Sequence, residues 1–183
     1  MKRTGMVKPP LVLTLICLIV TAALAIVYQV TLTPIQEAKT AAAEASCREL
    51  MPDADAFSEL VLPAETTTDS GAQLLAISEA SAGGQTIGWV FTAAASGYSG
   101  QVTVMCGIDC DGLVTRVKIS EHTETPGLGS KVAEPDYTDR FIGADAETSA
   151  AIDGITGATF TSVALKEAIG AAFLGYQQIA EVE

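Results

Sequence analysis

The sequence predicts an α+β protein that is held in a membrane by a single N-terminal helix. Three observations predict this class: an uncharged apolar run near the start, short apolar or alternating runs in the middle, and an amphipathic segment near the end. Helices that pack on a mostly antiparallel sheet make an α+β domain. We expect four parts: a basic N-terminus at 1–10, an anchor at 11–30, a stalk with an entry helix and loop at 31–73, and a folded domain at 74–183.

The expected anchor is the run from Leu11 to Val30, which carries no charged residue. Twenty helical residues span about 30 Å, the thickness of the hydrocarbon core. Two alternatives are a signal peptide cleaved near Ala23-Leu24-Ala25 and a lipoprotein anchor at Cys17. The run is longer than a usual signal core, and Ile16 stands where a lipobox needs a small residue. A retained span is therefore the favoured interpretation, with Tyr28 near its far end.

Charge predicts the orientation and excludes some partners. Lys2, Arg3 and Lys8 precede the apolar run, and no acidic residue does, so we expect the N-terminus in the cytoplasm and the rest outside. After Val30 the chain has seven basic against 22 acidic residues, a formal charge of −15. Such a domain repels nucleic acid and anionic lipid, and neither is an expected partner.

A helix is predicted to begin anew after the anchor. Thr33 and Gln36 form a capping box, with Pro34 at the first helical position. Alanine-rich sequence continues to Leu50, and Pro52 should end the helix. Residues 52–73 are mixed in character, and within them the cluster Thr66-Thr67-Thr68-Asp69-Ser70-Gly71 predicts a surface loop.

The middle of the domain is predicted to be a sheet of antiparallel hairpins, because its turns are short and rich in glycine. The expected strands are Leu74 to Ser81, Gln85 to Ala93, Gln101 to Ile108 and Leu113 to Ser120. A last helix, from Val163 to about Ala180, should pack an apolar stripe on the sheet. The stripe consists of Leu165, Ile169, Ala172, Phe173 and Tyr176.

Two loops stand out beside these elements. In Asp153-Gly154-Ile155-Thr156-Gly157-Ala158-Thr159 the small residues leave the backbone bare, and Thr161 and Ser162 are candidate N-caps of the following helix. The positive end of a helix favours phosphate, although many glycine-rich turns bind nothing. The second loop, 121–129, has a tight turn at Pro126-Gly127 and places Leu128 at its tip. Leu128 either covers a ligand or folds into the core.

Both loops resemble signatures of one known family. DGITGAT matches the Asp-Gly-x-(Ser/Thr)-Gly-Ala-Thr motif of proteins that carry FMN through a phosphoester on the last threonine. A chance match to its six constrained positions has a probability on the order of 10⁻⁷. ETPGLG, GYSG at 97–100 and GID at 107–109 extend the resemblance to about residues 97–170. The chain resembles the G subunit of the Rnf complex, a membrane-bound ferredoxin:NAD oxidoreductase coupled to ion transport. It is also similar to the C subunit of the sodium-translocating NADH:quinone reductase.

The resemblance implies roles for individual residues. Thr159 would be the attachment site, with Thr156, Gly157 and Ala158 along the phosphate. Glu124, Thr125 and Leu128 would approach the ribityl chain and the isoalloxazine, and Tyr98 would lie against the ring. An equally ordinary interpretation of Tyr98 is a strand-end residue with a solvated hydroxyl. A separate flavin transferase, using FAD, would attach the cofactor, and the partners would be integral membrane subunits of an Rnf-type complex.

The expected function is electron transfer rather than chemistry on a small substrate. The sequence shows no set of nucleophile, base and oxyanion donors, so no catalytic residue is assigned and turnover belongs to the assembled complex. No metal site is expected, because His122 is the only histidine and the cysteines lack ligand spacing. The cysteines are interpreted as buried small apolar residues, and the sequence does not decide whether Cys47, Cys106 or Cys110 form a disulfide. Two rival classes are a free-standing extracytoplasmic flavoprotein and a non-redox exported binding module.

Overall fold

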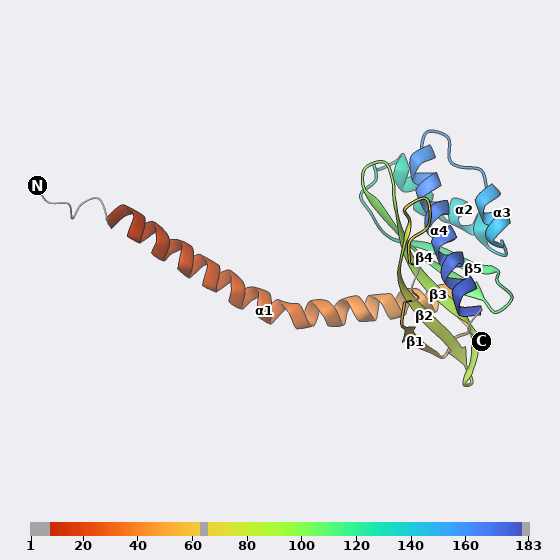
Figure 1. The fold of residues 1–183 in the computed structure, drawn as a ribbon, viewed down its shortest axis with the longest axis horizontal. Coiled ribbons are helices and arrows are strands. Elements are labelled where there is room, and N and C mark those ends of the chain that lie inside the picture. Colours follow the sequence, from red (N-terminus) through yellow and green to blue (C-terminus); the bar gives the residue numbers. More distant parts are fainter. Residues whose placement is uncertain (1–7, 63–65, 181–183) are drawn as a thin grey trace, which may run out of the picture. The chain divides into compact units, whose positions relative to one another are not determined.

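The computed structural model describes residues 8–62 and 66–180 and separates the chain into two units, Met1–Ala43 and Glu44–Glu183 (Figure 1). The helices are α1 (Lys8–Leu50), α2 (Pro135–Thr138), α3 (Ala146–Ala151) and α4 (Thr159–Ala180), with 3-10 turns η2 (Gly129–Ala133) and η3 (Asp139–Phe141). The strands are β1 (Ala56–Leu60), β2 (Gln73–Ala82), β3 (Gln85–Ser96), β4 (Gln101–Asp109) and β5 (Val114–His122).

Helix α1 contains the expected membrane-length segment. Its stretch Leu11–Gln29 is long and apolar enough to cross a bilayer, with a mean hydropathy of 2.8 and exposed side chains. The expected new helix start at Thr33 is wrong, because α1 continues without a break through this region. Pro34 removes only one backbone hydrogen bond, and the residues before it are already helical. The side chains of the proposed capping box lie outside the described residues, whereas the helix ends at Leu50, as Pro52 predicted.

The sheet is a meander of five antiparallel strands in the order β1-β2-β3-β4-β5. The four predicted strands are confirmed within a few residues of their expected ends. Strand β1 is additional and lies in the stretch of mixed character, 52–73, for which the sequence predicts no strand. It is a short edge strand in which Ala56, Ser58 and Glu59 are exposed, so it lacks the apolar alternation that identifies a strand in a sequence. The compact unit accordingly begins at Glu44 and includes residues that the sequence assigns to the stalk.

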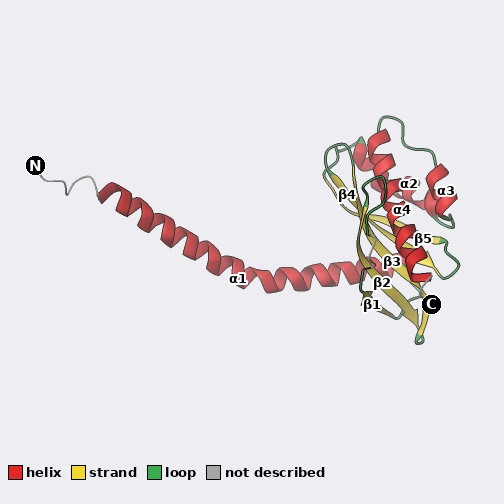
Figure 2. Cartoon of the chain, viewed as in Figure 1, coloured by secondary structure: helices red, strands yellow, loops and turns green. Residues whose placement is uncertain are grey.

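The two faces of the sheet are covered by different helices (Figure 2). Helix α4 packs its predicted apolar stripe on one face, against Phe91 and its neighbours, which confirms the α+β class. A Cβ on Gly175 would lie 2.8 Å from Leu74 and 3.1 Å from Phe91, so a glycine lets α4 approach the sheet closely. The last turn of α1 covers the other face. The hydrophobic cluster on this second face is the smaller of the two and comprises Cys47, Leu50, Met51, Ala80, Val90 and Met105.

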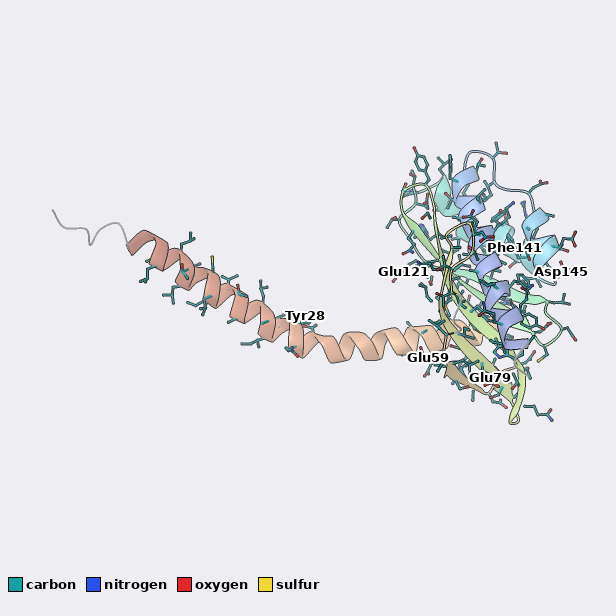
Figure 3. The ribbon with its side chains drawn as sticks, in the orientation of Figure 1. Tyr28, Glu59, Glu79, Glu121, Phe141 and Asp145 are labelled. Atoms are coloured by element: carbon teal, nitrogen blue, oxygen red, sulfur yellow. The ribbon has the colours of Figure 1, made fainter. Side chains whose placement is uncertain are left out.

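A layer of short helices lies beside α4 and connects β5 with the glycine-rich loop (Figure 1). Tyr137 and Phe141 are buried in this layer with their rings edge to face, 5.6 Å between centroids. Asp145 lies at its outer edge (Figure 3) and caps α3 by accepting a 2.8 Å hydrogen bond from the Thr148 amide. This bond lowers the pKa of Asp145.

Candidate functional site

A cavity of about 360 Å³ lies where three segments meet: the turn between β3 and β4, the loop after β5, and the first turn of α4. Its walls are formed by Tyr98, Glu124, Thr125, Leu128, Gly129, Gly157, Ala158, Thr159, Phe160 and Thr161. Seven of the eight residues that the resemblance assigned to the flavin therefore lie together. The eighth, Thr156, is exposed and does not line the cavity, and its role stays a prediction.

One wall is the start of α4, which begins at Thr159 rather than at Val163. The expected N-cap roles of Thr161 and Ser162 are wrong, since both lie inside the helix and are buried. Gly157 has a φ of +85°, a conformation that side chains disfavour, and it turns the chain into the helix. Thr159 itself is exposed at the cavity. The residue assigned to attachment thus stands at the positive end of a 22-residue helix.

Side chains of α4 hold the glycine-rich loop in place. The Ser162 hydroxyl accepts a 3.0 Å hydrogen bond from the Ile155 amide. The Lys166 ammonium donates to the carbonyl oxygens of Ala150, at 3.2 Å, and Ile152, at 3.1 Å. Ser162 and Lys166 are four residues apart and so share one face of the helix. The helix that carries Thr159 therefore also fixes the loop that precedes it.

The opposite wall is the loop after β5, and its predicted tight turn is present. The Leu128 amide donates to the Thr125 carbonyl at 3.2 Å, and Gly127 has a φ of +75°. Proline at the second position and a positive-φ glycine at the third are typical of a type II turn. Leu128 remains 48% exposed and lines the cavity instead of entering the core. A Cβ on Gly157 would lie 3.4 Å from Leu128, so this side chain reaches toward the helix wall.

Glu124 joins the three segments through its carboxylate, and the residue is only 5% exposed. Oε1 accepts from the amides of Tyr98 at 2.9 Å and Ser99 at 3.0 Å. Oε2 accepts from the Thr161 hydroxyl at 3.0 Å. A Cβ on Gly129 would lie 2.7 Å from Oε2, so a glycine is required beside the carboxylate. The family resemblance placed Glu124 near the ligand, but the sequence did not reveal this bracing.

Two aromatic rings stand at the mouth of the cavity. Tyr98 is 73% exposed and Phe160 is 70% exposed, and their centroids are 6.1 Å apart with an interplanar angle of 41°. Phe160 was not among the predicted site residues. Its signal in the sequence was an aromatic side chain directly after Thr159, on a helix whose other aromatics face the core. Exposed rings in an apolar mouth suit a planar aromatic ligand.

The remaining candidates lie outside this cavity. His122 is the last residue of β5, and its Nδ1 accepts a 3.3 Å hydrogen bond from the Glu124 amide. Cys47 and Cys106 are buried, which confirms their apolar character, and burial raises the pKa of Cys106 to about 12. Cys110 is exposed, contrary to expectation, with its sulfur 3.5 Å from the Thr86 carbonyl oxygen. Within residues 8–62 and 66–180, no three His, Cys, Asp or Glu side chains form a group suited to a metal ion.

The residues present fit a flavin phosphate. The cavity volume falls in the range of small-molecule sites, roughly 300–1,000 Å³. Tyr98, Phe160 and Leu128 offer apolar surface to a ring system. The N-terminus of α4 offers backbone donors and the Thr159 hydroxyl to an anionic group.

Comparisons with known proteins agree with this geometry. The model of the FMN-binding domain family matches residues 97–173. The chain is 30% identical to the G subunit of the Na(+)-translocating ferredoxin:NAD(+) oxidoreductase complex of Acetobacterium woodii, over 95% of this chain and 93% of that protein. It is 30% identical to the G subunit of the ion-translocating oxidoreductase complex of Aliivibrio fischeri, over 95% and 91%. The corresponding G subunit from Methanosarcina acetivorans is 27% identical, over 87% and 88%.

Among solved structures, the chain is similar to the C subunit of the Na(+)-translocating NADH-quinone reductase from Parabacteroides distasonis. The two are 24% identical with a TM-score of 0.47, covering 58% of this chain and 62% of that one. The G-subunit relatives match almost the entire chain, and their identity with it reaches 30%. The chain therefore belongs to the family of G subunits of ion-translocating oxidoreductase complexes, with an FMN-binding domain at residues 97–173.

Proposed function

We propose that this protein is a membrane-anchored electron-transfer subunit of an Rnf-type complex, with FMN attached to Thr159 through a phosphoester. The observation that carries the proposal is the position of Thr159, which is exposed in the cavity at the first residue of α4. Family membership over 95% of the chain supports assembly with membrane subunits. The apolar segment Leu11–Gln29 supplies the anchor.

The residues that line the cavity indicate which tasks belong to the flavin and which to the polypeptide. Bound FMN supplies one- or two-electron chemistry, and the polypeptide binds and orients it. Glu124 is the only acidic group among the described lining residues, and hydrogen bonds engage both of its oxygens. It is therefore a bracing group and not a general base for a small substrate. Turnover of electron donors and acceptors belongs to the complex.

Attachment requires a second enzyme, because a threonine hydroxyl is a weak nucleophile and no free base stands among the described lining residues to activate it. In the proposed step the Thr159 oxygen forms a bond to the flavin-side phosphorus of FAD. The pyrophosphate P–O bond breaks, AMP leaves, and the hydroxyl proton is released. The products are the phosphodiester on Thr159 and AMP. A flavin transferase is thus a maturation partner.

Peptide mapping of the full chain, made with and without a flavin transferase, tests the attachment. We expect a flavin-bearing peptide that contains Thr159, its complete loss in Thr159→Ala, and its retention in Thr159→Ser. Thr156→Ala is the matched control, since it removes a hydroxyl three residues away that does not line the cavity. Flavin on Thr156, or colour that persists in denatured Thr159→Ala protein, would overturn the assignment.

We also propose that residues 31–183 lie outside the cytoplasm and stay joined to the anchor. Lys2, Arg3 and Lys8 precede the apolar segment without an acidic residue, which favours a cytoplasmic N-terminus. Protease added to intact spheroplasts should remove the domain. Protection of the domain would contradict the orientation, and a mature N-terminus after Ala25 would contradict the retained anchor. Copurification with polytopic membrane subunits separates a complex subunit from a free-standing flavoprotein.

A further inference from the structure

We propose that the cavity accepts a flavin phosphodiester and discriminates against free FMN, because its fixed charge disfavours a second negative charge on the phosphate. The inference rests on the proposed function for the identity of the ligand. Beyond the identity of the ligand, the proposal specifies its ionic form: the folded domain binds the flavin phosphate with one negative charge in preference to the form with two. Covalent attachment would then do more than retain the cofactor, since it also removes the charge that the cavity resists.

The lining of the cavity has an unusual charge for a phosphate site. Among the ten described residues that line it, none is lysine, arginine or histidine. The one acidic side chain is that of Glu124, whose oxygens accept three hydrogen bonds. Phosphate sites commonly use arginine or lysine for charge-assisted hydrogen bonds. Among these ten residues, the positive contribution comes from the start of α4.

The sign of the net charge at the cavity follows from comparing the helix N-terminus with the Glu124 side chain. A helix N-terminus acts as roughly +0.5 of an elementary charge, whereas the Glu124 side chain counts as one full negative charge in the formal charge of the chain at pH 7. The fixed charge at the cavity is therefore negative. The surrounding domain adds to this, with six basic against 21 acidic residues from Glu44 onward. Backbone donors at the helix start can hold one phosphate charge, whereas each further charge is repelled.

The basic side chains near this part of the domain are occupied or placed elsewhere. Lys166 is bound to the carbonyl oxygens at the end of α3, and Lys118 forms an ion pair with Glu49. Arg140 lies 5.4 Å from the centroid of the Tyr137 ring and donates to the Asp136 carbonyl. Lys131 is exposed and does not line the cavity.

The phosphate monoester of free FMN and the phosphodiester of attached FMN differ in their negative charge. A phosphate monoester carries about −1.5 to −2 at pH 7, because its second pKa is near 6. A diester has lost one ionisable oxygen and carries a single negative charge. Formation of the bond to Thr159 converts the first form into the second. The residue that anchors the cofactor thereby also matches its charge to the cavity.

The test uses the full chain with Thr159→Ala, made without a transferase and kept in a neutral detergent. This substitution removes the side-chain atoms that a methyl ester would otherwise meet. The probes are FMN and riboflavin 5′-(methyl phosphate), which share every ring and ribityl contact and differ by one charge. We expect the methyl ester to bind more tightly than FMN by a factor on the order of ten, as measured by flavin fluorescence.

Glu124→Gln in the Thr159→Ala background identifies the source of the discrimination. A glutamine oxygen still accepts from Tyr98 and Ser99, and its amide donates to Thr161, so the wall keeps its hydrogen bonds without the charge. We expect the preference for the methyl ester to shrink severalfold. Glu121→Gln is the matched control, because it removes an exposed charge three residues away that does not line the cavity.

FMN binding as tightly as the methyl ester, or no binding of the methyl ester, overturns the proposal. A preference unaltered by Glu124→Gln overturns the role given to Glu124. Failure of the proposed function is separately visible as wild-type protein that gains no flavin mass when the transferase is present.

Discussion

The two walls of the cavity are stabilised in different ways. The helix wall is held by several independent bonds, in which Ser162 and Lys166 of α4 fix the backbone of the loop before Thr159. The loop wall has backbone bonds within its own turn, but the side-chain hydrogen bonds that join it to the two other segments all come, among the described residues, from one buried carboxylate, Glu124. Loss of one bond should therefore affect the helix wall locally, whereas loss of Glu124 should release the loop wall as a whole.

The largest expected effect is that of Glu124→Ala. The change leaves the amides of Tyr98 and Ser99 without their acceptor and opens space beside Gly129. Hydrogen bonds to charged groups contribute about 1.5–3 kcal/mol each, and buried unsatisfied donors carry a similar penalty. By the same reasoning we expect the free energy of unfolding to fall by about 3 kcal/mol, as measured by chemical denaturation of the detergent-solubilised chain.

Glu124→Gln is the control for this prediction, since it keeps an acceptor for both amides. It should cost about 1 kcal/mol. Thr159 should still be flavinylated in both variants under conditions where they are folded, because the helix wall has its own supports. Equal destabilisation by alanine and glutamine would show that the charge, and not the bracing geometry, stabilises the loop wall.

The next effect is expected on the helix wall, from Gly157→Ala. A φ of +85° is unfavourable for alanine by about 1–2 kcal/mol, and the new methyl group would lie 3.4 Å from Leu128. We expect lower stability and slower attachment of flavin to Thr159 by a purified transferase. Gly170→Ala is the matched control within α4, where no atom lies within 4 Å of an added Cβ. It should raise stability by about 0.5–1 kcal/mol. A Gly157→Ala protein as stable as wild type would contradict the strain argument.

Much of this architecture was predictable from the sequence, because the hydrophobic pattern carries it. Strands β2 to β5 follow from their apolar pattern and the glycine-rich turns between them, and the apolar stripe of α4 follows from periodicity. Strand β1 was missed because a short edge strand gains its order from pairing with β2, which periodicity does not report. The sequence does not reveal the continuation of α1 through Pro34, because Thr33, Pro34 and Gln36 have the pattern of a helix start although helix lies on both sides of them.

The site was less predictable than the fold. The resemblance brought most of the lining residues together, but bracing by Glu124 depends on contacts between segments far apart in sequence. The start of α4 was placed late because Thr161 and Ser162 resemble N-caps. In the structure their hydroxyls bond to Glu124 and to the Ile155 amide instead. A polar residue near a helix end can serve either role, and only the tertiary structure decides.

The smallest expected effect concerns Leu128, the residue that spans the gap between the walls. It is 48% exposed and lies near Gly157, so it contributes little to the core but covers the cavity. Burial of a whole leucine side chain is worth about 1.5–3 kcal/mol, and half of that area gives about 1 kcal/mol. Leu128→Ala should therefore lower the free energy of unfolding by about 1 kcal/mol or less.

The functional effect of Leu128→Ala should exceed its effect on stability. With less apolar cover, attached flavin should become more accessible to a soluble quencher such as iodide, while the mass of the protein still includes the cofactor. Leu113→Ala is a matched control, because that leucine is similarly exposed, at 37%, and lies outside the cavity. If both variants leave quenching unchanged, Leu128 does not cover the flavin and the loop wall serves only to brace the helix start.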